Sequence, residues 1–355
     1  MNLMDAVVFY KNTGLVFQKV DIPPLLPDMV LVRVAYTGFC GSDRGYVTGN
    51  KAADGYILGH ETSGIVEAVG SDVTGVDVGM RVIIRHTFCN NCQECRSGRP
   101  HQCVVNRRGI GVRDMPGAFA EYFCVFPQML IPIPPSVDLQ NAALVEVMAS
   151  ALHGYNCAKV NSGSALVMGG GPIGLCLVKI LRLYGFHTIV LSEPVKTKRD
   201  LGILYGADFA VNPLSESLGV AAYTATQNNG FDVVFECSGV KENINTGIEL
   251  AKCGGTVCIV SVIGEDISVS PRNIGFKEVY ITGSNSNTHA ENKQCLRWIQ
   301  SGLVDLRDMV TDTVTLEELP KAFIERVLTG KTNKLMVEIF PDPNQNTTRG
   351  FENDH

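Results

Sequence analysis

The sequence has no excess of basic residues and no long uninterrupted apolar segment. Its 30 lysines and arginines are outnumbered by 36 aspartates and glutamates, which gives a formal net charge of −6. Nucleic acids and anionic membranes both require a basic surface, so this balance argues against either as a partner. The most apolar long window, residues 160–178, contains Asn161, Ser162 and a Gly-Gly-Gly-Pro break. It is therefore a poor membrane span and indicates a strand, a turn and a helix instead.

The N-terminus also lacks the basic region and apolar run of a secretory signal, because Asp5 and Lys11 stand in their place. We therefore expect a cytoplasmic protein. The 36 glycines and 16 prolines follow no G-X-Y period, which excludes a collagen. With 355 residues the chain is long enough for about two domains. In a reducing cytosol, clusters among its 12 cysteines indicate metal ligands rather than disulfides.

Two kinds of pattern follow each other along the chain. The first 150 residues contain short β-rich runs separated by glycine and proline, which is typical of an all-β region with long functional loops. Ser136 begins a predicted helix that runs through Ala151. From Ser164 strands and helices alternate, which predicts a parallel sheet with right-handed crossovers. The strands expected there are 165–168, 188–191, 232–236, 255–260 and 279–282, and the helices include 174–184, 196–205 and 241–251.

A glycine-rich turn lies between the first strand and the first helix of the second region. Its glycines follow the pattern Gly169-x-Gly171-x-x-Gly174, and Pro172 and Ile173 lie between the last two. In this context the first glycine makes the turn, the second lets the backbone approach a pyrophosphate, and the third lets helix and strand pack closely. The helix N-terminus supplies free N–H groups for the phosphates. The turn therefore predicts a dinucleotide site.

The end of the next strand bears on which dinucleotide binds. Glu193 follows Gly174 by nineteen residues, where a carboxylate can accept hydrogen bonds from the adenosine ribose hydroxyls and repel a 2′-phosphate. Lys198, with Lys196 and Arg199, follows closely and could tolerate such a phosphate. We therefore favour NAD and keep NADP as the alternative.

Four cysteines form a compact group in the first region. Cys89, Cys92, Cys95 and Cys103 follow the spacing C-x2-C-x2-C-x7-C. Four thiolates satisfy tetrahedral Zn²⁺ and leave no open position, so the group predicts a structural zinc rather than a catalytic one. An iron–sulfur cluster can use similar spacings, but no other feature indicates electron transfer.

A second set of metal ligands lies upstream of these cysteines. Cys40, in the sequence GFCGSD, is followed twenty residues later by His60 and Glu61 in the sequence GHE. A thiolate, an imidazole and a carboxylate on glycine-flanked loops would bind Zn²⁺ and keep a position free for water or substrate. Glu146, near the start of the predicted interdomain helix, is a further candidate carboxylate.

With these motifs the chain resembles the zinc-containing medium-chain dehydrogenases, and within them the polyol branch typified by sorbitol dehydrogenase. GFCGSD, GHE, the four-cysteine spacing, GGGPIG and FECSG occur in the order and spacing of that family over residues 1 to about 340. The resemblance implies an α/β protein with a GroES-like β-rich catalytic domain and a doubly wound Rossmann domain. It also implies the boundaries: a discontinuous catalytic domain at 1–148 and 287–355, with a structural zinc lobe at about 86–110, and an NAD-binding domain at 149–286.

The resemblance also assigns roles to individual residues. Cys40 and His60 would ligate the catalytic zinc, Glu61 would complete the ligand set, and Glu146 would bind the metal or its water. Ser42 would belong to the proton relay. The chain departs from the family pattern at Gly45, where members usually carry a relay histidine, and after the last sheet strand, where an arginine and an aromatic are replaced by amides and hydroxyls.

The implied reaction is the zinc-dependent, NAD-linked oxidation of a secondary alcohol to a ketone, with two zinc ions per chain. Arg44, Tyr46, Asn285 and Asn287, with the serine between these asparagines, suit a polyol, sugar or cyclitol. A small diol of the butanediol type is the alternative, as is a polyol phosphate anchored by Arg44 or Arg113. A non-catalytic binding or structural relative is a further alternative. The family also implies a homodimer or homotetramer joined through strands near 279–284.

Overall fold

The computed structural model describes residues 3–112 and 114–340, so Arg113, one of the two arginines considered as a phosphate anchor, lies outside the described residues. The chain divides into two compact units. One is the continuous segment Val147–Glu291, and the other is built from the segments on either side of it. None of the helices in the described ranges is both long and apolar enough to cross a membrane.

The flanking segments fold into β-sheets. A small sheet has the strand order β2-β1-β4, and a larger one has the order β15-β16-β3-β5-β6-β8, with β7 also paired to β3. Inward-facing valines of β3, such as Val32 and Val34, pack with Val66 and Val82 of neighbouring strands in one core. The strands are β1 Leu3–Tyr10, β2 Gly14–Asp21, β3 Val30–Gly38, β4 Tyr56–Ile57, β5 Glu61–Val69, β6 Arg81–Ile84, β7 Tyr122–Val125, β8 Leu130–Pro132, β15 Val310–Val314 and β16 Lys334–Glu338.

Helices join these strands, and they correct the sequence prediction at two places. The segment after Cys40, expected as a loop, is the helix α1 Gly41–Thr48. The helix predicted from Ser136 to Ala151 is interrupted at Leu144 and divides into α3 Leu139–Ala143 and α4 Val145–Ala158. The Asp138 side chain caps α3 by accepting a hydrogen bond from the backbone N–H of Asn141 at 2.7 Å. The remaining helices are α2 Gln93–Arg96, α10 His289–Gln300, α11 Leu319–Ala322, the 3₁₀ turns Pro100–Gln102, Pro127–Met129 and Arg307–Met309, and a π-helical turn Phe323–Val327.

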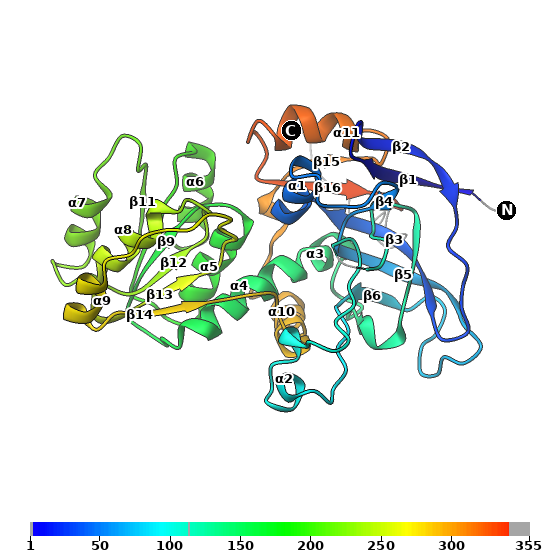
Figure 1. Cartoon of the computed structure of the whole chain (residues 1–355), viewed down its shortest axis with the longest axis horizontal. Helices are drawn as coiled ribbons and strands as arrows, with labels where there is room; N and C mark the ends of the chain where they lie inside the picture. Colours follow the sequence, from blue (N-terminus) through cyan, green and yellow to red (C-terminus); the bar gives the residue numbers. More distant parts are fainter. Residues whose placement is uncertain (1–2, 113, 341–355) are drawn as a thin grey trace, which may run out of the picture. The chain divides into compact units, whose positions relative to one another are not determined.

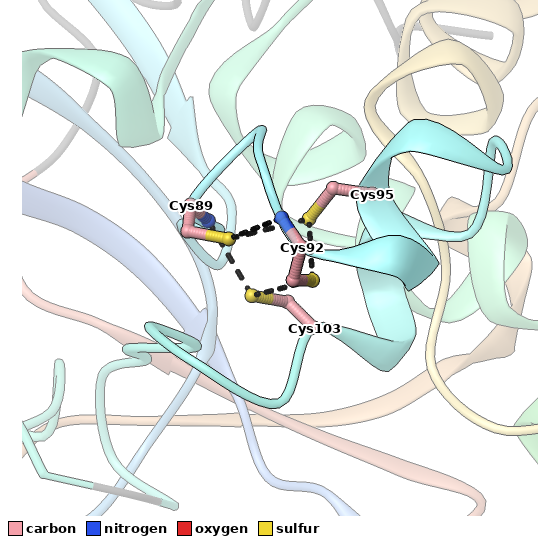
Figure 2. A group of neighbouring side chains, drawn as sticks. All are labelled: Cys89, Cys92, Cys95 and Cys103. Atoms are coloured by element: carbon pink, nitrogen blue, oxygen red, sulfur yellow. Dashed lines mark hydrogen bonds between the residues drawn. The ribbon is translucent and has the colours of Figure 1, made fainter.

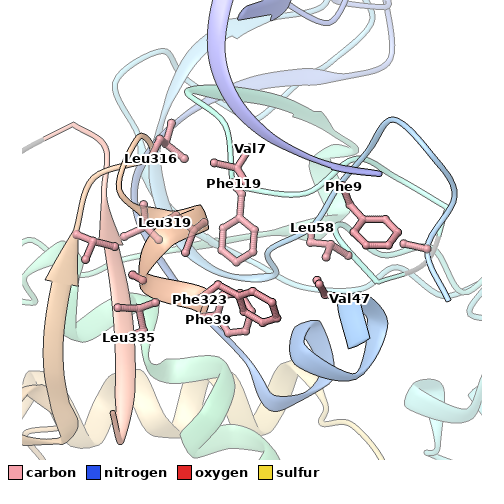
Figure 3. Packing of buried hydrophobic residues seen from close by; sticks show 14 residues of the cluster. Val7, Phe9, Phe39, Val47, Leu58, Phe119, Leu316, Leu319, Phe323 and Leu335 are labelled. Carbon is pink, nitrogen blue, oxygen red and sulfur yellow. The ribbon is translucent and has the colours of Figure 1, made fainter. Parts of the chain in front are cut away.

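A second core of this unit draws on residues from both ends of the chain (Figure 3). Phe39 packs against the rings of Phe119 and Phe323, with ring centroids 5.6 Å and 5.5 Å apart. Leu58 and Leu335 are fully buried in the same cluster. Phe39, Leu58 and Leu335 lie next to or close to Cys40, His60 and Lys334, so this core fixes the segments that carry polar site residues.

The segment Val147–Glu291 contains a parallel sheet with the strand order β11-β10-β9-β12-β13-β14 (Figure 1). The chain begins in the middle with β9, runs outward to β11, and then crosses to β12 on the other side of β9. Ligands of such sheets bind outside the carboxyl ends of the strands at this switch point. The strands are β9 Ser164–Met168, β10 Thr188–Ser192, β11 Phe209–Val211, β12 Phe231–Glu236, β13 Ala251–Ile259 and β14 Tyr280–Gly283.

Helices pack on both faces of this sheet. Leu166 and Met168 of β9 pack in the core that contains residues of α7 and α8. Val167, on the opposite face, lies against the start of α5 at Gly174. The predicted α/β fold, with a β-rich unit and a doubly wound sheet, is confirmed. The helices of this unit, besides α4, are α5 Pro172–Leu183, α6 Lys196–Leu204, α7 Leu218–Ala225, α8 Glu242–Leu250 and α9 Pro271–Lys277.

Candidate functional site

The structure brings the four predicted zinc cysteines together around one point (Figure 2). Their sulfur atoms lie 3.8 Å apart for Cys89 and Cys95, 3.4 Å for Cys92 and Cys95, and 3.9 Å for Cys92 and Cys103. Tetrahedral Zn–S bonds of about 2.3 Å require sulfur separations close to these values. The set therefore fits a closed four-thiolate site.

Backbone N–H groups point at the sulfur atoms of this lobe. The Cys89 sulfur accepts hydrogen bonds from the backbone N–H groups of Asn91 at 3.4 Å and Cys92 at 3.2 Å. The Cys103 sulfur accepts from the backbone N–H groups of Cys89 and Asn106, both at 3.4 Å. Burial alone would raise the pKa of Cys103, but these N–H groups outweigh it and lower that pKa to about 6. The loop thus stabilises the thiolate of Cys103, the form that binds a metal, whereas burial raises the pKa of Cys95 to about 12.

Cys40, His60 and Glu61 form the second group that could hold a metal, with ligand atoms within 4.8 Å of one another. Cys40 is the N-cap of α1, and Glu61 is the first residue of β5. Gly59, directly before His60, has a φ of +95°, and a Cβ there would lie 2.8 Å from the Phe119 ring. Only glycine allows the backbone this turn and this close packing, which together aim His60 toward Cys40.

Asp43 is a residue of this site that the sequence reasoning missed. It is fully buried on α1; one carboxylate oxygen lies 3.3 Å from His60 Nδ1, and the other accepts the Cys40 backbone N–H at 2.9 Å. Burial alone would lower the pKa of His60, but the charges of Asp43 and Cys40 raise it well above its usual value. A carboxylate on one nitrogen of a histidine leaves the other, Nε2, to bind a metal. The motif GFCGSD contains this signal, since Asp43 follows the cysteine by three residues.

Lys334 is a second missed residue, and it comes from the distant end of the chain. Its ammonium group forms an ion pair with Glu61 and donates a hydrogen bond to the Phe39 carbonyl at 3.1 Å. Both side chains of the pair are only 2% exposed. Gly38 leaves the space for them, because a Cβ there would meet Glu61 Oε2 and the end of the Lys334 side chain.

Glu146 lies close to this group without belonging to the compact ligand set. Burial raises the pKa of its carboxyl group, and the negative charge of Glu61 adds to that shift. The charges of His60, Lys334 and Arg85 act in the opposite direction. Glu146 therefore belongs to the same buried charge cluster as Glu61, as a neighbour of the three ligand groups.

Helix α1 also carries three of the other predicted residues. Ser42 Oγ lies 3.4 Å from His60 Nε2, and Ser42 is exposed. Arg44 is exposed as well. The Tyr46 hydroxyl donates a hydrogen bond to the Val112 carbonyl at 2.7 Å, so this hydroxyl already has an acceptor within the protein.

The glycine-rich turn has the geometry that a dinucleotide site requires. Gly169 has a φ of +103°, and a Cβ on Gly174 would lie 1.9 Å from the Gly169 carbonyl oxygen. Gly171, the N-cap of α5, has no atom within 4 Å of where its Cβ would be, so its backbone is open to a ligand. Pro172 and Ile173 form the first turn of α5. The turn fits a pyrophosphate at the helix N-terminus.

Glu193 closes this turn from the end of β10. Its carboxylate accepts the Gly170 backbone N–H at 2.7 Å and the Val195 backbone N–H at 2.8 Å, and the residue is only 6% exposed. The Arg199 guanidinium donates to the carbonyls of Glu193 and Pro194 at 2.8 Å and 2.7 Å. Lys198 is partly buried on α6. A fixed carboxylate therefore lies against the glycine-rich turn, and Arg199 is held by backbone oxygens.

The two asparagines predicted as substrate contacts differ in environment. Asn285 is exposed after β14. Asn287 is only 1% exposed, and its amide donates a hydrogen bond to Ser150 Oγ at 2.8 Å. Its burial and this bond give Asn287 a packing role within its unit and argue against direct contact with a substrate.

Comparisons with known proteins show the family to which the chain belongs. Residues 26–135 match the family of the alcohol dehydrogenase GroES-like domain, and residues 172–301 match the zinc-binding dehydrogenase family. The L-threonine 3-dehydrogenase of Pyrococcus abyssi is 31% identical over 90% of this chain and 93% of its own length. The sorbitol dehydrogenase of Bacillus subtilis is 28% identical over 96% and 98% of the two chains. A crystal structure described as a zinc-binding dehydrogenase from Sinorhizobium meliloti bound to NADP is 33% identical, covers 95% of this chain and 100% of that chain, and superposes with a TM-score of 0.88.

Proposed function

The chain belongs to the zinc-containing medium-chain dehydrogenases and is an NAD(P)-linked alcohol dehydrogenase, and from this premise we propose that it oxidises a secondary hydroxyl of a polyol, sugar or cyclitol to a ketone with zinc and NAD. The observation that carries the proposal is the convergence of Cys40, His60 and Glu61 within 4.8 Å. One thiol, one imidazole and one carboxylate form a donor set that Zn²⁺ accepts. We further propose that the four-cysteine lobe holds a second zinc ion.

The residues around this donor set have separate tasks. When bound, zinc supplies the Lewis acidity that lowers the pKa of an alcohol hydroxyl, and the dinucleotide supplies the hydride acceptor. Asp43 fixes the ring of His60, and Lys334 holds Glu61. Ser42 Oγ lies 3.4 Å from His60 Nε2, so it can accept a proton from a substrate hydroxyl that is held next to His60. Because Ser42 is exposed and position 45 is glycine, the proton passes from Ser42 to water.

Glu193 supports NAD as the cofactor. Its two N–H partners fix a carboxylate beside the glycine-rich turn, where it can accept from ribose hydroxyls and repels a 2′-phosphate. The NADP found in the Sinorhizobium meliloti structure belongs to that protein. NADP is therefore the alternative that a direct comparison of cofactors must test.

The proposed substrate class rests on polar side chains at the positions assigned to substrate binding in the sequence analysis. Arg44 and Asn285 are exposed and polar, which suits several hydroxyl groups. Two relatives bear on the choice, the sorbitol dehydrogenase of Bacillus subtilis and the L-threonine 3-dehydrogenase of Pyrococcus abyssi. Small diols are the alternative substrate class. A polyol, sugar or cyclitol is preferred, while the secondary hydroxyl of threonine belongs in any substrate panel.

The test is an assay of NAD reduction over polyols, cyclitols, sugar phosphates, short diols and L-threonine, combined with zinc analysis. We expect two zinc ions per chain and turnover with at least one polyhydroxylated substrate. Cys40→Ser should abolish turnover and leave NAD binding intact, while Cys124→Ser, which removes a thiol remote from both metal groups, should change neither. One zinc ion per chain in the wild type would refute the catalytic zinc site, and turnover confined to short diols or L-threonine would refute the substrate class.

We also propose a homo-oligomer and a cytoplasmic location. Strand β14 is the last in its sheet order, and its Tyr280 and Ile281 side chains are 68% and 41% exposed. An exposed apolar edge strand is a ready surface for pairing with a second copy. The thiols of the four-cysteine group and of Cys40 form no disulfide among the described residues, which suits a reducing compartment. Light scattering should therefore give the mass of a dimer or tetramer.

A further inference from the structure

A thiol, an imidazole and a carboxylate form a hydrogen-bonded chain on α4 and at the start of α10, within the unit Val147–Glu291. His153 and Cys157 are one helical turn apart on α4, so their side chains meet on one face. Cys157 Sγ lies 3.5 Å from His153 Nε2, and His153 Nδ1 lies 2.9 Å from Glu291 Oε1. The two ring nitrogens of His153 therefore connect the thiol to the carboxylate.

Glu291 is held in place by several donors. Its Oε1 also accepts the Asn156 amide at 2.8 Å, and its Oε2 accepts the Thr288 backbone N–H at 2.7 Å and the Thr288 hydroxyl at 2.9 Å. Burial alone would raise the pKa of Glu291, but the hydrogen bonds and charge of His153, with those of Asn156 and Thr288, lower it below its usual value. The group facing His153 is therefore a fixed carboxylate.

His153 is correspondingly stabilised in its charged form. Burial alone would lower its pKa, but the hydrogen bonds to Cys157 and Glu291 outweigh this and raise it to about 9. The His153 ring therefore places a positive charge 3.5 Å from the Cys157 sulfur. The same order of groups, a nucleophile, a histidine and an orienting acid, activates cysteines in enzymes.

We propose that Cys157 is an activated thiol and a site of covalent modification by peroxides and other small electrophiles, separate from both zinc groups. Cys157 is partly exposed, so a reagent of this size can reach its sulfur. With a peroxide, the thiolate sulfur attacks one peroxide oxygen. The S–O bond forms as the O–O bond breaks, hydroxide or alkoxide leaves and takes a proton from water, and the sulfur is oxidised by two electrons to a sulfenic acid while the peroxide is reduced.

The other cysteines of this unit provide the contrast. Cys258 is fully buried and donates its S–H to the Gly154 carbonyl at 3.4 Å, and burial raises its pKa to about 12. Burial also raises the pKa of Cys237 well above its usual value. Cys253 is more exposed than Cys157, and no hydrogen bond to a histidine is among its described contacts. If exposure alone determines the rate of modification, Cys253 reacts first. If activation by His153 determines it, Cys157 reacts first.

The test measures alkylation of each cysteine in the zinc-loaded full-length protein by iodoacetamide at pH 6, followed by peptide mass spectrometry. An ordinary cysteine is only about 0.3% thiolate at this pH, so its alkylation is slow. The charged ring of His153, held 3.5 Å from the Cys157 sulfur, should speed the attack of that sulfur, and we expect a rate about tenfold higher for Cys157 than for Cys253. Equal rates, or faster reaction of Cys253, would overturn the proposal without any variant.

Two variants separate activation from exposure. His153→Gln should slow the alkylation of Cys157 about tenfold and leave the rate of Cys253 unchanged. Glu291→Gln, whose amide oxygen keeps one acceptor for Thr288, should also slow the alkylation of Cys157. An unchanged alkylation rate of Cys157 in both variants would refute the role of His153 and Glu291 in activating this cysteine. After treatment with hydrogen peroxide, a dimedone adduct on Cys157 and none on Cys253 is expected. Absence of that adduct from Cys157 would refute the peroxide reaction.

Discussion

Replacing Glu193 by serine should move the cofactor preference from NAD toward NADP. The wild-type carboxylate is 6% exposed and is fixed against the glycine-rich turn by the backbone N–H groups of Gly170 and Val195 at 2.7 Å and 2.8 Å. It cannot rotate away from a bound nucleotide without losing both bonds. A 2′-phosphate on the adenosine ribose would therefore meet a fixed negative charge, while a 2′-hydroxyl would meet an acceptor.

The size of the effect follows from Coulomb's law. Two unit charges about 4 Å apart interact with about 4 kcal/mol at an effective dielectric of about 20, the value suited to a site near a protein surface. Since about 1.4 kcal/mol corresponds to a factor of ten, the carboxylate should disfavour NADP by about 10³. Arg199 offers little compensation, because its guanidinium is bound to the carbonyls of Glu193 and Pro194.

Steady-state kinetics with both cofactors measures this directly. The ratio of kcat/KM for NAD over NADP should be about 10³ in the wild type and should fall to about tenfold or less in Glu193→Ser. Lys198→Ala is the matched control and should leave the wild-type ratio within about threefold. A wild-type enzyme that uses NADP as well as NAD, or a Glu193→Ser enzyme that keeps the wild-type ratio, would refute the assignment of Glu193. Because the serine leaves two N–H groups without their acceptor, about 1–3 kcal/mol of stability should be lost, and a melting curve must accompany the kinetics.

The remaining predictions concern the two metal groups. Cys92→Ser should lower the zinc content by one ion per chain and lower the unfolding midpoint, because the binding energy of structural zinc is folding energy; an unchanged zinc content would contradict it. Asp43→Asn should weaken zinc binding at the His60 group by about 10–100-fold in a chelator competition assay, and a change below twofold would contradict the role of Asp43 in orienting His60. Lys334→Met should lower the free energy of unfolding by about 3–5 kcal/mol in urea titrations, since it leaves the buried Glu61 carboxylate without its partner. Adding Glu61→Gln should recover part of that loss, and a double variant no more stable than Lys334→Met would refute the pairing.

The features that could be predicted from the sequence are those whose geometry is local. The positive φ of Gly169 and the 1.9 Å approach of a Gly174 Cβ to the Gly169 carbonyl are both consequences of one six-residue turn. The four cysteines are likewise confined to a fifteen-residue segment, so their spacing alone limits how they can meet. The strands and helices around the glycine-rich turn were predicted for the same reason, since their apolar runs are bounded by glycine and proline.

The features that could not be predicted depend on contacts between distant segments. Lys334 is 273 residues from Glu61, and a lysine at the start of a strand ordinarily indicates a solvated charge. Helix α1 was expected as a loop because its glycines at 41 and 45 are poor helix formers. It forms because Asp43 accepts the Cys40 backbone N–H, and because the buried Val47 packs in the aromatic core around Phe39.

The buried charges around Cys40 explain why a divalent cation suits this site. With the cysteine as a thiolate, the group holds negative charges on Cys40, Asp43, Glu61 and Glu146, whereas its buried cationic side chains are Lys334 and Arg85. Two negative charges remain, and a divalent cation bound by a neutral His60 balances them. The pKa shifts have the directions that this excess of negative charge requires. Burial raises the pKa of Glu146, and the charge of Glu61 adds to this shift. Burial alone would lower the pKa of His60, but the charges of Asp43 and Cys40 overcome it and raise that pKa. In the same way, Glu61 and Cys40 overcome burial to raise the pKa of Lys334, which keeps this lysine charged as the partner of Glu61.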